Sequence, residues 1–138
     1  MTPPEESSPG IAATATCRGG YATDVRIRHH ALRVDEPEGV GGDDTGPMPT
    51  ELLCAALASC FALALAHVAL KRDLDLPGLE VTARAERAGR ELRYGRYVVE
   101  ASADVPREEL AALLERAARF CWVSNTLAQP PDVEYRVT

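Results

Sequence analysis

The chain has 138 residues and a formal net charge of −6 at pH 7, with a sequence pI of about 5.1. This length is sufficient for one domain with a hydrophobic core and too short for two. An acidic chain offers no broad phosphate-binding surface, so we expect no nucleic acid among its partners.

The first ten residues differ in composition from the rest of the chain. Residues 1–10 are rich in Pro, Glu and Ser, which is typical of a disordered tail. They lack the basic and apolar regions of a signal peptide, so we expect a cytoplasmic location. Residues 11–138 are predicted to form a single domain.

Three short strands are predicted after this tail. Residues 11–17 carry β-branched side chains, while residues 23–29 and 31–35 alternate apolar and polar side chains. Turn residues between them indicate an antiparallel meander. The next segment, residues 36–49, has the sequence EPEGVGGDDTGPMP and is so rich in turn residues that we expect a loop without regular structure.

A long apolar helix is predicted to follow this loop. Thr50 can cap its first turn, and Glu51 favours the positive end of its dipole. Apolar residues then continue to Leu70 without a polar face, so the helix must be buried on all sides. Its alanine-rich composition argues against a membrane span. Because one chain of this length can hardly enclose such a helix, we expect a homodimer that shares the core.

The second half of the chain combines strand and helix patterns. Residues 79–87 and 92–105 alternate as a strand pair, and residues 107–120 have the apolar spacing of an amphipathic helix. A short helical turn is predicted at residues 124–128 and a closing strand at residues 132–137. The order βββ-α-ββ-α-β predicts an α+β domain.

Four cysteines, Cys17, Cys54, Cys60 and Cys121, are the candidate reactive groups. In a chain of this type they are interpreted as thiols rather than as a disulfide framework. The spacings from 17 to 54, 54 to 60 and 60 to 121 are 37, 6 and 61 residues, which gives no CxxC pair and no expected metal site. A thiol in an apolar setting is most often a small hydrophobic residue, and we keep that interpretation for Cys17 and Cys54.

Cys60 and Cys121 lie in two stretches that resemble a known family. The segment GGDDTGPMPTELLCAALASCFALAL resembles the entry to the central helix of the OsmC/Ohr family of organic hydroperoxide reductases, where a GTNP-like turn precedes the helix with the reactive cysteine. The segment RFCWVSNTL resembles the family's second cysteine motif, with Cys121, Ser124 and Asn125 in the pattern C-x-x-S-N. The resemblance covers nearly the whole chain after residue 10, and it implies the OsmC-like fold and an intertwined homodimer.

Thiol peroxidase chemistry is the activity that this resemblance implies. Cys60 would attack an organic hydroperoxide and become a sulfenic acid, and Cys121 would resolve it as a disulfide. An external dithiol would reduce this disulfide, without a metal or a bound cofactor. Apolar side chains suited to an alkyl hydroperoxide lie near both motifs, although core packing explains each of them equally well: Leu53, Leu57, Phe61 and Trp122.

The carboxylate that supports the thiolate in Ohr-type relatives is displaced in this chain. Thr50 occupies the position of the family glutamate, and Glu51 follows one residue later. At about 100° per residue, Glu51 and Cys60 project from opposite faces of one helix. Thr50 is left with at most a weak hydrogen-bonding role, so the resemblance indicates a divergent OsmC-like branch.

The supporting arginine of the family has several candidates here. Arg18, directly after the ATATC segment, is the nearest match, with an offset of about one residue. Arg26, Arg28 or Arg33 could substitute for it, and a solvated strand face is the ordinary interpretation of each. A second departure is Trp122, which stands where the family usually has a proline.

The main alternative is a non-catalytic protein on the same fold that binds a small hydrophobic ligand in an apolar pocket at the dimer interface. A purely structural dimer is a third possibility. The three hypotheses differ in whether Cys60 is a reactive thiolate and whether it can form a disulfide with Cys121.

Overall fold

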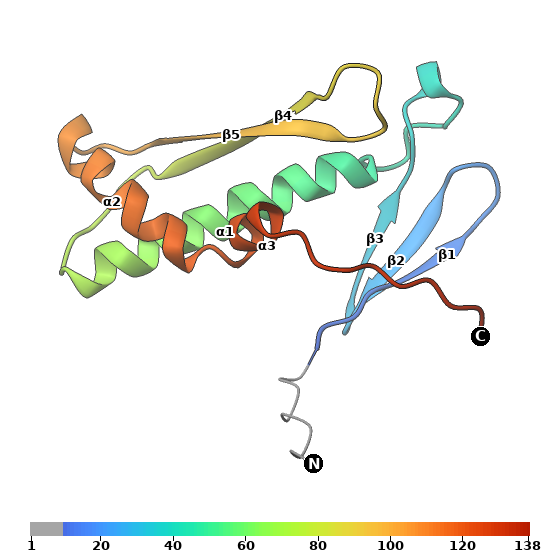
Figure 1. The fold of residues 1–138 in the computed structure, drawn as a ribbon, viewed down its shortest axis with the longest axis horizontal. Coiled ribbons are helices and arrows are strands. Elements are labelled where there is room, and N and C mark those ends of the chain that lie inside the picture. Colours follow the sequence, from blue (N-terminus) through green and yellow to red (C-terminus); the bar gives the residue numbers. More distant parts are fainter. Residues whose placement is uncertain (1–9) are drawn as a thin grey trace, which may run out of the picture. The chain divides into compact units, whose positions relative to one another are not determined.

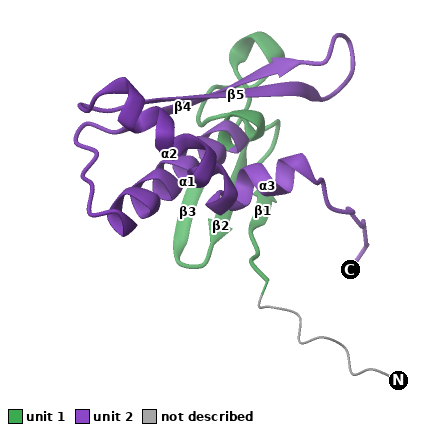
Figure 2. Ribbon diagram, turned by 60° about the vertical axis from the view of Figure 1, so that its left-hand side comes forward, with its two compact units in different colours: residues 1–52 green, residues 53–138 purple. Residues whose placement is uncertain are grey.

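The structure is a computed structural model that describes residues 10–138. The chain divides into two compact units, the first ending at Leu52 and the second running from Leu53 to the C-terminus (Figure 2). The predicted disordered tail lies outside the described residues, apart from residue 10.

The first unit contains a three-stranded antiparallel sheet with the order β1-β2-β3 (Figure 1). Its strands are β1 (Thr14–Cys17), β2 (Thr23–Ile27) and β3 (His30–Val34). The predicted meander is therefore confirmed, with strands shorter than expected. Residues 11–13 precede the first paired position, and Arg28 has a φ of 54°, which ends β2 and forms the hairpin turn.

The loop after β3 is more ordered than predicted, because a buried carboxylate organises it. Asp35 is only 1% exposed and accepts hydrogen bonds from the backbone N–H groups of Glu36, Asp43 and Thr45 at 2.8, 3.3 and 3.1 Å. The Thr45 hydroxyl donates a fourth bond at 2.7 Å. The segment also contains a 3₁₀ turn, η1 (Glu38–Val40), so the expectation of no regular structure was wrong.

The long helix, α1 (Pro49–Lys71), starts one residue earlier than predicted. Pro49 is its first helical residue, a position that suits a fixed φ and a missing N–H. Thr50 therefore lies inside the first turn, and the prediction that it caps the helix was wrong. Glu51 stabilises the start of the helix instead, because its carboxylate accepts a hydrogen bond from the Met48 backbone N–H at 2.9 Å.

The second unit packs the rest of α1 against a hairpin and two further helices. The hairpin consists of β4 (Glu80–Arg87) and β5 (Tyr94–Ser102), and Figure 1 shows it extending alongside α1. The helices are α2 (Arg107–Phe120) and α3 (Trp122–Ala128), the latter starting two residues before the predicted turn. The α+β class is confirmed.

The core of the second unit is built mainly from α1 and α2. Its buried members are Leu57, Phe61, Ala64, Leu65, Val68, Ala69, Leu110, Leu113, Ala117 and Cys121. Inward-facing residues of the hairpin, such as Val81 and Val99, cover this cluster. These contacts are those of a central helix in a globular core.

One face of α1 is exposed among residues 10–138. Leu63 and Leu70 are each 72% exposed, and they lie seven residues apart, on the same side of the helix. The described residues therefore leave this side of α1 exposed, and the prediction that a second copy covers it stays a prediction. Among residues 10–138, α1 is the one helix whose length and composition would allow it to cross a membrane.

The predicted closing strand is absent from the described chain. Residues 132–137 have no regular structure, and Val133, Tyr135 and Val137 are largely exposed. The alternating pattern favours an extended conformation, but a strand also needs a neighbour that shares its backbone hydrogen bonds. Residues 132–137 pair with neither sheet, so this prediction was wrong.

Candidate active site around Cys60 and Cys121

The structure places both candidate cysteines at one apolar core. Cys60, in the middle of α1, is half-buried and packs against the core cluster, whereas Cys121 belongs to it and is 0% exposed. Both are free thiols. Leu57 and Phe61, predicted to line a substrate pocket, are buried members of the same cluster. Four of the predicted site residues are therefore brought into one cluster.

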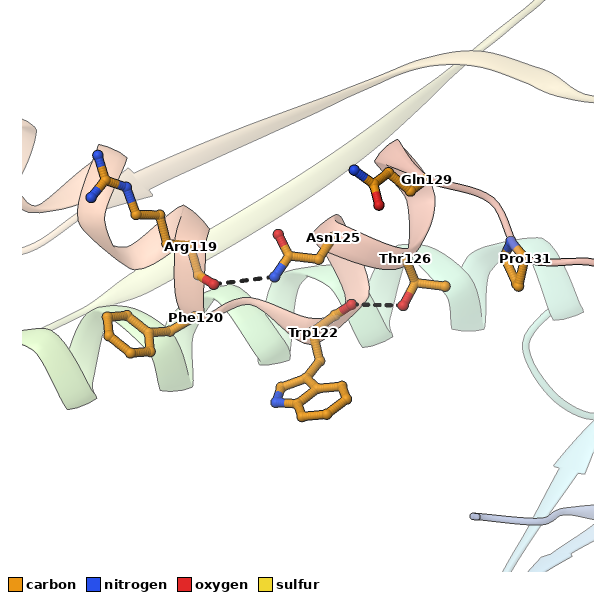
Figure 3. A pocket seen from close by; sticks show the side chains of 7 residues that line it. All are labelled: Arg119, Phe120, Trp122, Asn125, Thr126, Gln129 and Pro131. Atoms are coloured by element: carbon orange, nitrogen blue, oxygen red, sulfur yellow. Dashed lines mark hydrogen bonds between the residues drawn. The ribbon is translucent and has the colours of Figure 1, made fainter. Parts of the chain in front are cut away.

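Cys121 sits at the junction between α2 and α3. Its backbone is extended, with φ −85° and ψ 100°, which separates the two helices. Its carbonyl oxygen accepts the Asn125 N–H at 3.0 Å and the Ser124 hydroxyl at 3.1 Å. The Asn125 side-chain amide also donates to the Arg119 carbonyl at 3.1 Å, as Figure 3 shows. The C-x-x-S-N motif thus fixes the backbone that carries the second thiol.

The described core around the two thiols is apolar. The buried cluster around them consists of aliphatic and aromatic side chains and alanines.

Trp122 and Leu53, also predicted to line a substrate pocket, lie outside the buried core cluster that contains Leu57 and Phe61. Trp122 is 83% exposed, and Leu53 is also exposed. With Arg119, Phe120, Asn125, Thr126, Gln129 and Pro131, Trp122 lines a cavity of about 520 Å³ (Figure 3). Neither cysteine is among the residues that line this cavity.

Arg18 lies in the first unit, in the turn after β1, and it is held by a carboxylate that the sequence did not single out. The Arg18 Nε donates to one oxygen of Asp24 at 2.6 Å, and the Arg33 Nε donates to the other at 2.7 Å. The hydrogen bonds from Arg18 and then Arg33 lower the pKa of the Asp24 carboxyl. The signal that could have revealed Asp24 is the strand register, which sets it opposite Arg33.

The two helix-start residues take no part in this arrangement. Glu51 is used at the start of α1, where it binds Met48, and Thr50 is exposed in the same turn. The residues from 10 to 138 include no group of three or more His, Cys, Asp or Glu side chains that could hold a metal ion.

Comparison with known proteins agrees with this fold. The profile of the OsmC-like protein family matches residues 41–136, a range that contains both cysteines. The organic hydroperoxide resistance protein OhrB of Bacillus subtilis (strain 168) is 28% identical over 129 residues, covering 90% of this chain and 95% of that protein. This similarity extends over both units.

Two solved structures are also similar. An organic hydroperoxide resistance protein from Elizabethkingia anophelis has a TM-score of 0.67 at 28% identity, covering 91% of this chain and 92% of that one. The organic hydroperoxide resistance protein OsmC from Legionella pneumophila has a TM-score of 0.71 at 23% identity, covering 88% and 91%, and supports the fold alone. Because the family profile spans well over half of the sequence, this chain belongs to the OsmC-like protein family.

Proposed function

We propose that this protein is a thiol-dependent peroxidase that reduces organic hydroperoxides, with Cys60 as the peroxidatic thiol and Cys121 as the resolving thiol. The observation that carries the proposal is the position of both thiols at one apolar core, with Cys60 half-buried and Cys121 fully buried. The Bacillus and Elizabethkingia relatives, both named organic hydroperoxide resistance proteins, support the same substrate class.

The reaction has three balanced steps. The Cys60 thiolate attacks the terminal oxygen of the hydroperoxide, so that an S–O bond forms, the O–O bond breaks and the alkoxide takes a proton to leave as an alcohol. The Cys121 thiol then attacks the sulfenic sulfur, so that a disulfide forms and water leaves. An external dithiol reduces this disulfide and is itself oxidised, which returns both thiols without a metal or a bound cofactor.

The difference in exposure between the two cysteines supports the proposed roles. Cys60 is half-buried, so it can meet a substrate, while the core shields Cys121 from peroxide. The apolar side chains of Leu57 and Phe61 near these thiols suit an alkyl group better than they suit water or hydrogen peroxide. We place the reaction in the cytoplasm, where thiol reductants keep such cysteines reduced.

A homodimer is part of this proposal. The uncovered face of α1, with Leu63 and Leu70 each 72% exposed, is an apolar surface that a second copy would bury. Contiguous apolar surface of this kind is typical of obligate dimer interfaces. A dimer would also meet the requirement, drawn from the sequence, that α1 be covered on all sides.

Mass spectrometry of the reduced protein after one equivalent of cumene hydroperoxide tests the chemistry. We expect a Cys60–Cys121 disulfide in the wild type and sulfenic acid on Cys60 in Cys121→Ser. The matched control is Cys54→Ser, which removes another half-buried thiol of α1 and should leave the disulfide unchanged. If the Cys60 and Cys121 thiols stay reduced under excess peroxide, the proposal is wrong.

One observation favours a second function, the binding of a small hydrophobic ligand. The cavity of about 520 Å³ beside Phe120 and Trp122 is of the size that such ligands occupy. Because Trp122 is the one tryptophan of the chain, its fluorescence would report occupancy directly. Saturable quenching by a hydrophobic probe, together with unreactive thiols, would favour this alternative over the peroxidase.

A further inference from the structure

One residue separates α2 from α3, and it is the candidate resolving cysteine. Helix α2 ends at Phe120 and α3 begins at Trp122, so Cys121 alone forms the break, with φ −85° and ψ 100°. Its side chain is 0% exposed and belongs to the core cluster. Because this backbone is extended, the Cα–Cβ bond of Cys121 points in a different direction from the one that a continuous helix would give. The break therefore sets where the buried sulfur points.

Asn125 connects the two helices across this break (Figure 3). Its side-chain amide donates to the Arg119 carbonyl in the last turn of α2 at 3.1 Å, and its backbone N–H donates to the Cys121 carbonyl at 3.0 Å. In a helix continued through Cys121, the Arg119 carbonyl would accept the N–H of the residue four positions ahead instead. The Asn125 amide thus satisfies a carbonyl that the end of α2 leaves open, and it favours the broken conformation over the continuous helix.

The folding of the second unit does not depend on the Asn125 side chain. Asn125 is exposed and lies outside the core cluster, so it adds little to the hydrophobic stabilisation of the fold. Other side chains of α3, those of Val123 and Leu127, pack against the cluster and hold this helix in place. Loss of the Asn125 amide should therefore leave α3 on the core and loosen only the junction at Cys121.

We propose that Asn125 is a positioning residue for the second step of the peroxidase cycle, where it holds Cys121 in the orientation from which the thiol attacks the Cys60 sulfenic acid. This inference rests on the proposed peroxidase function. In that step the Cys121 sulfur forms an S–S bond to the Cys60 sulfur, the S–O bond breaks, and the hydroxyl leaves as water with the proton of the Cys121 thiol. A disulfide tolerates only a narrow range of S–S distances and dihedral angles, so the rate of this step depends on the direction of the Cys121 side chain.

The first step of the cycle should not depend on Asn125. Attack on the peroxide uses Cys60 of α1, whereas the hydrogen bonds of Asn125 lie within α2, α3 and the residue between them. In Asn125→Ala we therefore expect sulfenic acid to form at the wild-type rate. The disulfide should form roughly threefold to tenfold more slowly, the range that the loss of one net hydrogen bond supplies. Asn125→Gln keeps a side-chain amide and should recover part of the rate.

The experiment follows a single turnover of the reduced protein with one equivalent of cumene hydroperoxide by quenched flow. Quenched samples are labelled with a reagent specific for sulfenic acid, and peptide mass spectrometry quantifies the sulfenic acid on Cys60 and its disulfide with Cys121 at each time. The matched control is Glu115→Gln, which removes the exposed ion pair between Glu115 and Arg119 at 3.7 Å and leaves the hydrogen bonds of Asn125 in place. We expect both rates to be unchanged in this control, whereas sulfenic acid should accumulate in Asn125→Ala before the disulfide appears.

The outcomes separate this inference from the function on which it rests. If the wild type completes both steps and Asn125→Ala forms the disulfide at the wild-type rate, or slows both steps equally, the positioning role is wrong and the peroxidase stands. If wild-type Cys60 forms no sulfenic acid, the peroxidase is wrong and the positioning role falls with it. Circular dichroism checks that each variant is folded. If Asn125→Ala does not fold, Ser124→Ala takes its place, because it removes the hydroxyl that donates to the Cys121 carbonyl at 3.1 Å and should slow the same step.

Discussion

The uncovered face of α1 gives a quantitative prediction for the proposed dimer. Full burial of a leucine side chain is worth about 1.5–3 kcal/mol. With 72% of each still exposed, Leu63 and Leu70 retain roughly 1–2 kcal/mol apiece for burial by a second copy. Two leucines in each of two copies therefore contribute about 4–8 kcal/mol, which corresponds to a factor of about 10³ or more in the dissociation constant.

The double variant Leu63→Ser/Leu70→Ser removes this contribution. Both side chains are exposed in the single chain, so its own core should stay intact. We expect the wild type to sediment as a dimer at micromolar concentration and the double variant as a folded monomer, in analytical ultracentrifugation over a dilution series. Leu92→Ser is the control, because Leu92 is fully exposed in the β4–β5 turn. A double variant with a dissociation constant within tenfold of the wild type would refute the reasoning.

Three further predictions concern the stability of the chain. The hydrogen bond from the Thr45 hydroxyl, followed by those from the Glu36 and Thr45 backbones, lowers the pKa of the Asp35 carboxyl, so its stabilising effect is present above the unfolded-state pKa and is lost as the pH falls through the folded-state pKa. Thermal melts of Asp35→Asn from pH 3 to 7 should therefore show the largest loss of melting temperature, relative to the wild type, at neutral pH. As the pH is lowered, the melting temperature of the variant should fall less steeply than that of the wild type. A constant difference between the two melting temperatures across this range would argue against the carboxylate. Asp73, which ends α1 in the left-handed region at φ 54°, should give a gain of about 0.5–1 kcal/mol when replaced by Gly, measured by urea unfolding, and a loss would show that its side chain is needed. Leu65→Ala, at a fully buried position of α1, should lower the free energy of unfolding by about 2–5 kcal/mol in the same assay. A loss below about 1 kcal/mol would mean that neighbouring side chains move to fill the cavity.

Local patterns in the sequence were sufficient to predict most elements. The β4–β5 hairpin and α2 follow from alternation and from helical spacing, because in both cases one face of the element packs against the core. The two cysteine motifs led to Cys60 and Cys121, which the fold brings to one core cluster. Their surroundings were harder to predict. Leu53 lies one helical turn before Leu57 on the same face, yet it is exposed because the core cluster begins at Leu57.

Features that depend on distant pairs were missed for a different reason. The order of the loop after β3 depends on Asp35, which binds groups eight and ten residues ahead of it. The shared carboxylate of Asp24 depends on the exact register of three strands. Neither residue stands out in the sequence, since an aspartate in a strand or a loop is ordinarily a solvated side chain. Only the backbone geometry shows which donors each carboxylate meets.

Two sequence patterns describe surfaces that stay exposed among residues 10–138. The apolar run of α1 predicts cover on every side, and the alternation of residues 132–137 predicts a neighbouring strand; the described residues cover only one side of α1 and provide no such strand. A sequence pattern records what a segment packs against in the working protein, and it does not distinguish a neighbour in the same chain from one in another copy. The same reasoning applies to the activation of Cys60. Tests of the chemistry of Cys60 should therefore be made on the assembled protein, at concentrations where the ultracentrifuge shows the dimer.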